Sequence, residues 1–502
     1  MNAPLRRVGV VVLVLFGLLF ANLNWVQGYK ADGYRNSQYN GRVLLSDYER
    51  QRGTIYDANG VPLATSVATN DQLKYLRKYP GGDMFEPILG YRPVNLGATG
   101  IENAMNPELA GTAASQQSLT DLFFDRTTAG DNVFLTLDQR IQKVAYDDLV
   151  GNGGPGAVVV MNPTTGAIMA MASTPSFDPS DLSSHNGTTA QSAYNKISGE
   201  ANQPFLNKAI ADADPPGSTF KVIVSAAALN AGYTPQDVIP AGSFYQPIPG
   251  SSYIMHNAED DTCPTDTMTL IEALTVSCNT AFGQLGVKLG AKALTDTARA
   301  FGFGDSSLTI AGSGDRAIHV AASQVGDMTT SSGNDDANLI AQSSIGQFDD
   351  RITPLMGCMI AATVINNGVQ MKPYLVDKLQ RPDLTVQQVG TPEVLRTPIS
   401  PSVAQNLQQM MYSVVANGTG RGAIVEGVQI GGKTGTAQNG TGPDGKLLPN
   451  HRWFIGYVTD TSGKPLAAIC VFLKNGGQHP KKQAPTVAQD VIKAIVAAQS
   501  GH

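Results

Sequence analysis

The stretch that decides the fold is PPGSTFK, which occupies residues 215–221. Pro and Gly end an irregular segment, and the apolar run at 222–229 predicts a helix. Ser218 therefore lies at a helix start, where backbone N–H groups favour developing negative charge. Lys221 shares a face with Ser218 and can act as the base that a weak hydroxyl nucleophile needs. Alone the pattern is weak, because an N-capping Ser beside a solvated Lys explains it equally well.

A second stretch with chemical potential is GGKTGTA at residues 431–437, inside a segment that predicts a strand from residue 428 onward. Lys433 would add a fixed positive charge, and Gly435 would let a ligand backbone approach the strand closely. Thr434 and Thr436 offer hydroxyl groups to a carboxylate. An ordinary edge strand carrying a Lys is the competing interpretation.

Three S-x-N triplets compete to be a third element. SHN at 184–186 and SGN at 332–334 lie in polar loops, whereas SCN at 277–279 lies between the apolar runs 268–276 and 281–289. A short turn between two helices fixes side chains better than a polar loop does. The preferred residues are therefore Ser277 and Asn279.

The order SxxK, SxN, KTG, spread over about 220 residues, resembles the penicillin-recognising serine acyltransferases, which are the penicillin-binding proteins and serine β-lactamases. The resemblance implies an α+β fold with a central antiparallel sheet flanked by helices, an all-helical subdomain, and an active site between them. The order of the predicted elements agrees with this fold, because strands at both ends of the domain, separated by helices, suggest a single sheet. The predicted strands are 157–161, 167–172, 427–438, 452–459 and 465–474, and the predicted helices are 218–230, 269–290, 354–366, 401–416 and 485–499.

Three further stretches point to the monofunctional, class B penicillin-binding proteins. RGTIYDANGVPLA at 52–64 resembles the RGxIxDxNGxxLA box of their non-catalytic domain, and GIE at 100–102 resembles a later element of it. TLDQRIQ at 136–142 resembles the linker into the transpeptidase domain. The short N-terminal module is most like that of an actinobacterial branch of this class. Cys278 departs from the β-lactamase pattern, which has Asp there, so proton transfer assigned to that Asp is not carried over.

The resemblance implies that Lys221 takes the proton of Ser218, which attacks the D-Ala–D-Ala carbonyl of a peptidoglycan stem peptide. It implies no metal or cofactor, and β-lactams as covalent inhibitors. The implied catalytic residues are Ser218, Lys221, Ser277, Asn279 and Lys433, and the implied substrate-binding residues are Thr434, Gly435 and Thr436.

Several other activities are weighed against a transpeptidase. A β-lactamase would not normally carry the N-terminal boxes, and a bifunctional enzyme would need a glycosyltransferase domain that the roughly 120 intervening residues cannot hold. A D,D-carboxypeptidase shares all three motifs, since water merely replaces the amine acceptor. A non-enzymatic β-lactam sensor or scaffold would need a cytoplasmic signalling domain, and about seven residues precede the apolar N-terminal run.

The N-terminal segment predicts membrane attachment. Arg6 and Arg7 precede 19 residues, 8–26, that are long enough to cross a bilayer, with Trp25 and Tyr29 at the interface. A cleaved signal peptide is the alternative. The expected organisation is a cytoplasmic tail (1–7), an anchor (8–26), a mostly extended module (27–150) and an extracytoplasmic transpeptidase domain (151–502). Partners would include the membrane and division or elongation proteins.

Composition supports these expectations. The 502 residues carry a net charge of −6, which excludes a general electrostatic grip on nucleic acid, and 6 His without an HExxH motif, which disfavours a metal site. Cys358 and Cys470 lie in apolar runs and are expected to be buried thiols. Export would permit a bridge between Cys263 and Cys278, the alternative being four free thiols.

Overall fold

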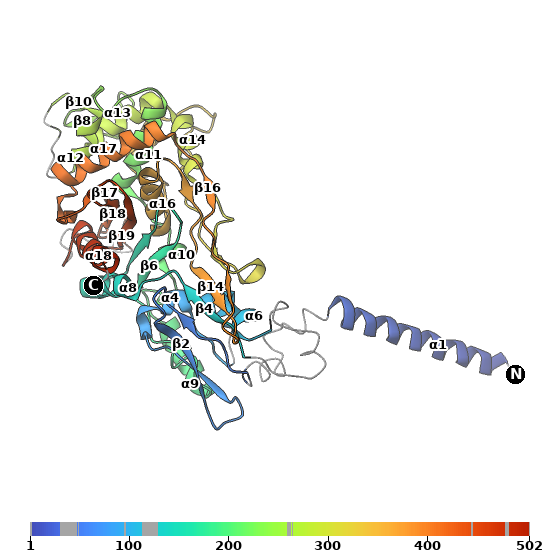
Figure 1. Cartoon of the computed structure of the whole chain (residues 1–502). Helices are drawn as coiled ribbons and strands as arrows, with labels where there is room; N and C mark the ends of the chain where they lie inside the picture. The colour runs from blue at the N-terminus through green and yellow to red at the C-terminus, as the bar shows by residue number, and fades with distance from the viewer. Residues whose placement is uncertain are drawn as a thin grey trace.

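The computed structural model describes residues 3–30, 48, 50–94, 97–112, 129–258, 263, 265–442, 445–476 and 481–500. Its central element is a five-stranded antiparallel sheet in the order β17-β18-β19-β5-β6 (Figure 1). Residues 156–174 thus pair with the C-terminal strands, as the sequence predicts. The strands are β5 (Gly156–Met161), β6 (Ile168–Thr174), β17 (Gln429–Ala437), β18 (His451–Thr459) and β19 (Pro465–Leu473).

Helices cover both faces of this sheet. On one face lies α16 (Pro354–Ile365), every residue of which is buried, as expected for a helix that is apolar all round. On the other face lie α8 (Gln139–Asn152) and α18 (Ala484–Gln499). In α18, Val487, Val491 and Ile495 recur every fourth residue and bury one stripe against the sheet.

A helical subdomain packs beside the sheet (Figure 1). The predicted helix at 269–290 is two helices separated at Ser277 and Cys278, which matches the turn expected there. The amphipathic helix α14 was not predicted, although Leu294, Ala298 and Phe301 form its buried stripe. The helices of this subdomain are α11 (Lys221–Asn230), α12 (Leu270–Val276), α13 (Asn279–Leu289), α14 (Ala291–Phe301), α15 (Ala337–Ser343) and α17 (Pro401–Asn417).

A second sheet underlies the N-terminal module, in the order β15-β14-β4-β1-β2-β3. Its first two strands come from residues far along the chain, because β14 pairs antiparallel with β4. The sheet therefore joins the N-terminal module to the region after α16. Its strands are β1 (Ile55–Tyr56), β2 (Pro62–Ala68), β3 (Tyr75–Lys78), β4 (Asn132–Leu135), β14 (Val376–Gln380) and β15 (Val386–Gln388).

A buried ion cluster connects the two N-terminal sequence boxes. Arg52 Nε donates to Glu102 Oε2 at 2.7 Å, and Arg77 Nε donates to Glu102 Oε1 at 2.5 Å. The Glu102 side chain has no exposed surface. Burial raises the pKa of the Glu102 carboxyl, but the charges of Arg77 and Arg52 outweigh it and lower that pKa to about 2.

The N-terminal helix α1 (Ala3–Asn24) continues into a π-helical turn, Trp25–Tyr29. The segment Arg6–Tyr29 is long and apolar enough to cross a membrane, and none of it is buried against the rest of the protein. An exposed apolar helix of 24 residues fits the hydrocarbon core of a bilayer. The predicted anchor at 8–26 lies within it.

Candidate active site

Ser218 lies in a 3₁₀ turn, Gly217–Phe220, that leads directly into α11. Gly217 has a φ of +52°, and a Cβ there would lie 2.3 Å from the carbonyl oxygen of Thr436. Only glycine therefore lets this turn adopt its conformation and rest against β17. Trp453 Nε1, on β18, donates to the carbonyl oxygen of Pro215 at 2.9 Å and so attaches the turn to the sheet.

Lys221, on the first turn of α11, is fully buried. Its Nζ donates to the carbonyl oxygen of Ser277 at 2.7 Å and to Asn279 Oδ1 at 2.7 Å. Burial, and then the nearby charge of Lys433, lower the pKa of the Lys221 amine well below its ordinary value. A neutral amine can accept a proton, so Lys221 can serve as a general base.

Ser277 lies between the two buried lysines. Lys433 Nζ donates to Ser277 Oγ at 2.8 Å, and Lys221 Nζ approaches the same oxygen at 3.3 Å. Ser277 adopts a left-handed conformation with a φ of +64° at the end of α12, which is uncommon for a residue with a side chain. Burial lowers the pKa of Lys433 to about 7. One hydroxyl thus links two amines that can exchange protons through it.

Asn279 begins α13, and its Oδ1 accepts from Lys221 Nζ at 2.7 Å. Its Nδ2 donates to the carbonyl oxygen of His256 at 3.1 Å. Cys278 makes no side-chain cap for α13. Asn257 Oδ1 provides that cap instead, because it accepts from the backbone N–H groups of Asn279 and Thr280 at 2.9 and 3.1 Å.

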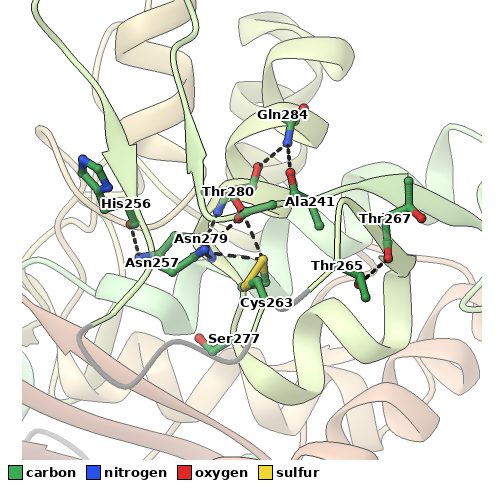
Figure 2. Close-up of a disulfide and its surroundings, with 12 residues drawn as sticks. Ala241, His256, Asn257, Cys263, Thr265, Thr267, Ser277, Asn279, Thr280 and Gln284 are labelled. Atoms are coloured by element: carbon green, nitrogen blue, oxygen red, sulfur yellow. Dashed lines mark hydrogen bonds between the residues drawn. A yellow bond between two sulfur atoms is a disulfide. The ribbon is translucent and has the colours of Figure 1, made fainter.

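A disulfide joins Cys278 to Cys263, with a Cα–Cα distance of 5.8 Å (Figure 2). This confirms the bridge that the sequence permitted and leaves Cys358 and Cys470 as buried free thiols. The bridge ties Cys263 to the turn that carries Ser277 and Asn279.

The KTG stretch lies on β17, which forms one edge of the central sheet and pairs with β18. A Cβ at Gly435 would lie 2.7 Å from the carbonyl oxygen of Pro216. The space beside Gly435 thus accommodates the turn before Ser218, a reason for glycine that the sequence did not suggest. Thr434 Oγ1 lies 2.6 Å from Thr419 Oγ1, and Thr436 Oγ1 accepts from Arg452 Nη1 at 2.7 Å.

The structure brings the predicted site residues together and places the other triplets elsewhere. His185 Nδ1 lies 2.6 Å from Asp71 Oδ2 of the N-terminal module, and Ser332 lies in an exposed loop. Sequence reasoning missed Asn257, Thr419 and Arg452, whose positions depend on how distant segments pack. Across the described residues, no group of three or more His, Cys, Asp or Glu side chains could hold a metal ion.

Comparison with known proteins decides the family. Residues 156–497 match the penicillin binding protein transpeptidase domain, and residues 52–133 match the penicillin binding protein A dimerisation domain. The chain belongs to the class B penicillin-binding protein transpeptidases. This confirms the family and the fold that the three motifs predict.

Relatives of this class B penicillin-binding protein match over nearly its whole length. It is 39% identical to the peptidoglycan D,D-transpeptidase PbpA of Mycolicibacterium smegmatis and 38% identical to that of Mycobacterium tuberculosis, each alignment covering 99% of both chains. The crystal structure of PBPA from M. tuberculosis has a TM-score of 0.80 at 36% identity and covers 89% of this chain and 100% of that one. The imipenem acyl-enzyme complex of that protein has a TM-score of 0.81 at 37% identity. That match covers 90% of this chain and 100% of the other.

Proposed function

We propose that this protein is a peptidoglycan D,D-transpeptidase that cross-links stem peptides through an acyl-enzyme on Ser218. The observation that carries the proposal is the pair of buried lysines on either side of Ser277, next to the turn that holds Ser218. Burying two amines side by side is costly, and groups whose pKa values are perturbed in this way cluster at functional sites. The relatives' names, and the acyl-enzyme complexes of the M. tuberculosis protein, support the same reaction.

In the acylation step, neutral Lys221 takes the proton of Ser218 as its Oγ attacks the carbonyl carbon of the D-Ala–D-Ala bond. The backbone N–H groups of Ser218 and Thr436 stabilise the oxyanion. The C–N bond then breaks as Ser277 passes its proton to the departing D-Ala amine, and Lys221 returns the proton it took to Ser277 Oγ, which lies 3.3 Å from its Nζ. Lys433 keeps Lys221 neutral by like-charge repulsion, and Asn279 holds both Lys221 and the substrate amide.

Substrate binding follows from the edge position of β17. A stem peptide pairs with the free edge of this strand by β-addition, and Thr434 and Thr436 bind its terminal carboxylate. Gly435 keeps the strand close to the nucleophile turn. An amine from a second stem peptide then attacks the acyl-enzyme, forms the new amide bond and releases Ser218 with its proton restored.

The location of these steps follows from the N-terminal helix. Arg6 and Arg7 favour an N-terminus on the cytoplasmic side. We infer that an anchor at 8–26 holds the module at 27–150 and the transpeptidase domain at 151–502 outside the membrane, where peptidoglycan is built. Division or elongation proteins are the partners expected for such a membrane-anchored enzyme.

The test is covalent labelling with a fluorescent penicillin, followed by peptide mapping. We expect the label on Ser218 and none on Ser218→Ala, whose melting temperature should stay that of the parent. Ser332→Ala, an exposed Ser of the competing SGN triplet, serves as the matched control and should label fully. Undiminished labelling of Ser218→Ala would reject Ser218 as the nucleophile. Incubation with a donor peptide and an amine acceptor separates a transpeptidase, which forms the cross-linked product, from a carboxypeptidase, which releases D-Ala only.

A further inference from the structure

A segment outside the three motifs lies against the turn that carries the nucleophile. This supporting segment consists of residues 346–352. The backbone N–H of Gly217 donates to the carbonyl oxygen of Gly346 at 2.9 Å. Asp214 exchanges two backbone hydrogen bonds with Ile352, at 2.9 and 3.1 Å. Gly346 has a φ of +68°, and a Cβ there would lie 2.0 Å from the carbonyl oxygen of Gly217. The two backbones are therefore in direct contact, so a shift of the supporting segment would move the turn.

The supporting segment contains a buried carboxyl group, that of Asp350, which has no exposed surface. Its Oδ1 accepts from the backbone N–H of Gly326 at 3.0 Å. The hydroxyl of Ser343, at the end of α15 and equally buried, lies 3.0 Å from Asp350 Oδ1 and 2.8 Å from Oδ2. In the part of the chain that the structure describes, no cation pairs with this carboxyl, and Arg351 donates instead to the carbonyl oxygens of Phe348 and Asp350. One carboxyl thus joins the supporting segment to two other parts of the helical subdomain.

The contacts of Asp350 are those of a protonated carboxyl. A hydroxyl has one hydrogen, yet the Ser343 hydroxyl lies within hydrogen-bond distance of both carboxyl oxygens. A proton on Asp350 Oδ2 satisfies both contacts, because Oδ2 then donates to Ser343 while Ser343 donates to Oδ1. A buried carboxylate without a counter-charge is unfavourable, so the neutral acid is the form that suits this site. Burial accordingly raises the pKa of Asp350 to about 8.

The charged groups around Asp350 have other partners. Its sequence neighbours Asp349 and Arg351 lie 3.5 Å apart and act on the Asp350 carboxyl with opposite signs. Charged side chains on the elements next to the supporting segment are also bonded, namely Asp327 with Thr329, Asp336 with the N-terminus of α15, Asp214 with Lys474 and His451, and Lys221 with Asn279. Loss of the Asp350 proton to solvent therefore leaves a buried negative charge that these groups do not neutralise.

We propose that Asp350 is a positioning residue for acylation: its protonated carboxyl holds the supporting segment in place, and the segment holds Ser218 and its backbone N–H in the reactive geometry. This inference rests on the proposed transpeptidase function and adds a residue that touches neither the substrate nor the nucleophile. When Asp350 ionises, the reciprocal bonds with Ser343 are lost and the supporting segment shifts to admit water to the charge. The turn that carries Ser218 shifts with it, and acylation slows.

The test is the pH dependence of penicillin acylation. For the full-length protein we measure the second-order rate constant with benzylpenicillin at about pH 7 and about pH 9, on either side of the pKa of about 8. The protonated fraction of Asp350 falls about tenfold across this range, so the rate constant of the parent should fall by up to about tenfold. Asp350→Asn keeps the shape of the neutral acid but cannot ionise. In this variant the decline between the two pH values should be about threefold smaller than in the parent, or smaller still.

Two further variants make the result specific. Asp349→Asn makes the same chemical change at the exposed neighbour and should keep the decline of the parent. Asp350→Ser also cannot ionise, and it provides the same comparison if the Asn side chain does not fit the buried site. Other groups that titrate in this range, such as Lys433 with its pKa of about 7, act in every one of these proteins. The comparison of declines therefore isolates Asp350.

A merely structural role for Asp350 predicts that its variants are slower by the same factor at both pH values. An equal decline in the parent and in the Asp350 variants, or no decline in the parent, would overturn the inference. Neither outcome would affect the proposed function, which fails only if the parent protein is not acylated on Ser218.

Discussion

Breaking the disulfide between Cys263 and Cys278 should destabilise the wall of the active site that carries Ser277. The bridge closes a loop with a sequence separation of 15 residues, for which the chain-entropy model gives about 3 kcal/mol. Taking about 2 °C per kcal/mol for a large domain, Cys263→Ser should lower the melting temperature by roughly 6 °C. Cys263 is the better residue to change, because Cys278 adjoins both Ser277 and Asn279.

The effect on acylation should be smaller than the effect of removing a site residue. Asn257 still accepts from two N–H groups of α13 when the bridge is broken, so the turn keeps part of its support. We expect Cys263→Ser to slow penicillin acylation by about tenfold or less, since a misplaced positioning group costs less than an absent one.

The assay has three readouts. Thiol counting under denaturing, non-reducing conditions should find two free thiols in the parent protein, Cys358 and Cys470. Melting and acylation are then measured with and without a dithiol reductant. The reductant should convert the parent to the behaviour of Cys263→Ser and have no further effect on that variant. Four free thiols in the parent, or an unchanged melting temperature in the variant, would refute the reasoning.

Three further predictions concern the buried charges and the choice of triplet. In a pH–rate profile, acylation should slow toward acid pH as Lys221 gains a proton. Lys433→Met should move this acid limb to higher pH, because it removes a like charge that lowers the pKa of Lys221. An acid limb that stays in place contradicts the coupling of the two lysines. Ser277→Ala should slow acylation about 100-fold or more whereas Ser332→Ala should not, and the reverse ranking of the measured rates would reject the chosen triplet. Glu102→Gln should reduce the free energy of unfolding in urea by about 3–5 kcal/mol, because two buried guanidinium groups lose their counter-charge. In the parent, the Glu102 carboxylate stabilises the fold above its unfolded pKa of about 4.5, and this stabilisation is lost as the pH falls toward about 2. If Glu102→Gln loses as much stability as the parent in an acid titration, Glu102 is not the counter-charge of the two guanidinium groups.

The residues of the candidate site could be proposed from the sequence because their signals are local. PPGSTFK and GGKTGTA each combine a reactive side chain with the glycine or proline that shapes the backbone around it. The choice of Ser277 over Ser332 needed only the observation that apolar runs flank one triplet and polar residues flank the other. Much of the central sheet was predictable for the same reason, since β5, β6 and β19 are largely apolar runs.

The missed residues are those whose roles arise from distant pairing. Arg452 meets Thr436 through the register of β17 on β18, and one residue of slip would place it on the opposite face of the sheet. Asn257 caps a helix that begins 22 residues later. The pairing of β14 with β4 joins segments more than 240 residues apart. Even the shortest of these separations, the 16 residues from Thr436 to Arg452, is longer than a local motif, so the contacts depend on how the chain folds back.

Hydrogen bonds from both side chain and backbone join the N-terminal module to the transpeptidase sheet. Thr136 Oγ1 donates to the carbonyl oxygen of Ile168 on β6 at 2.7 Å. The backbone N–H of Asp138 donates to the carbonyl oxygen of Met169 on the same strand at 2.8 Å. On the other side, Ala58 donates to the carbonyl oxygen of Leu137 at 2.8 Å. The TLD stretch is therefore bonded to the first N-terminal box and to the catalytic sheet at once. Because β14 also adds to the N-terminal sheet, the module and the catalytic sheet are linked at two separate points. Residues 136–138 and β14 therefore both connect the module to the catalytic sheet.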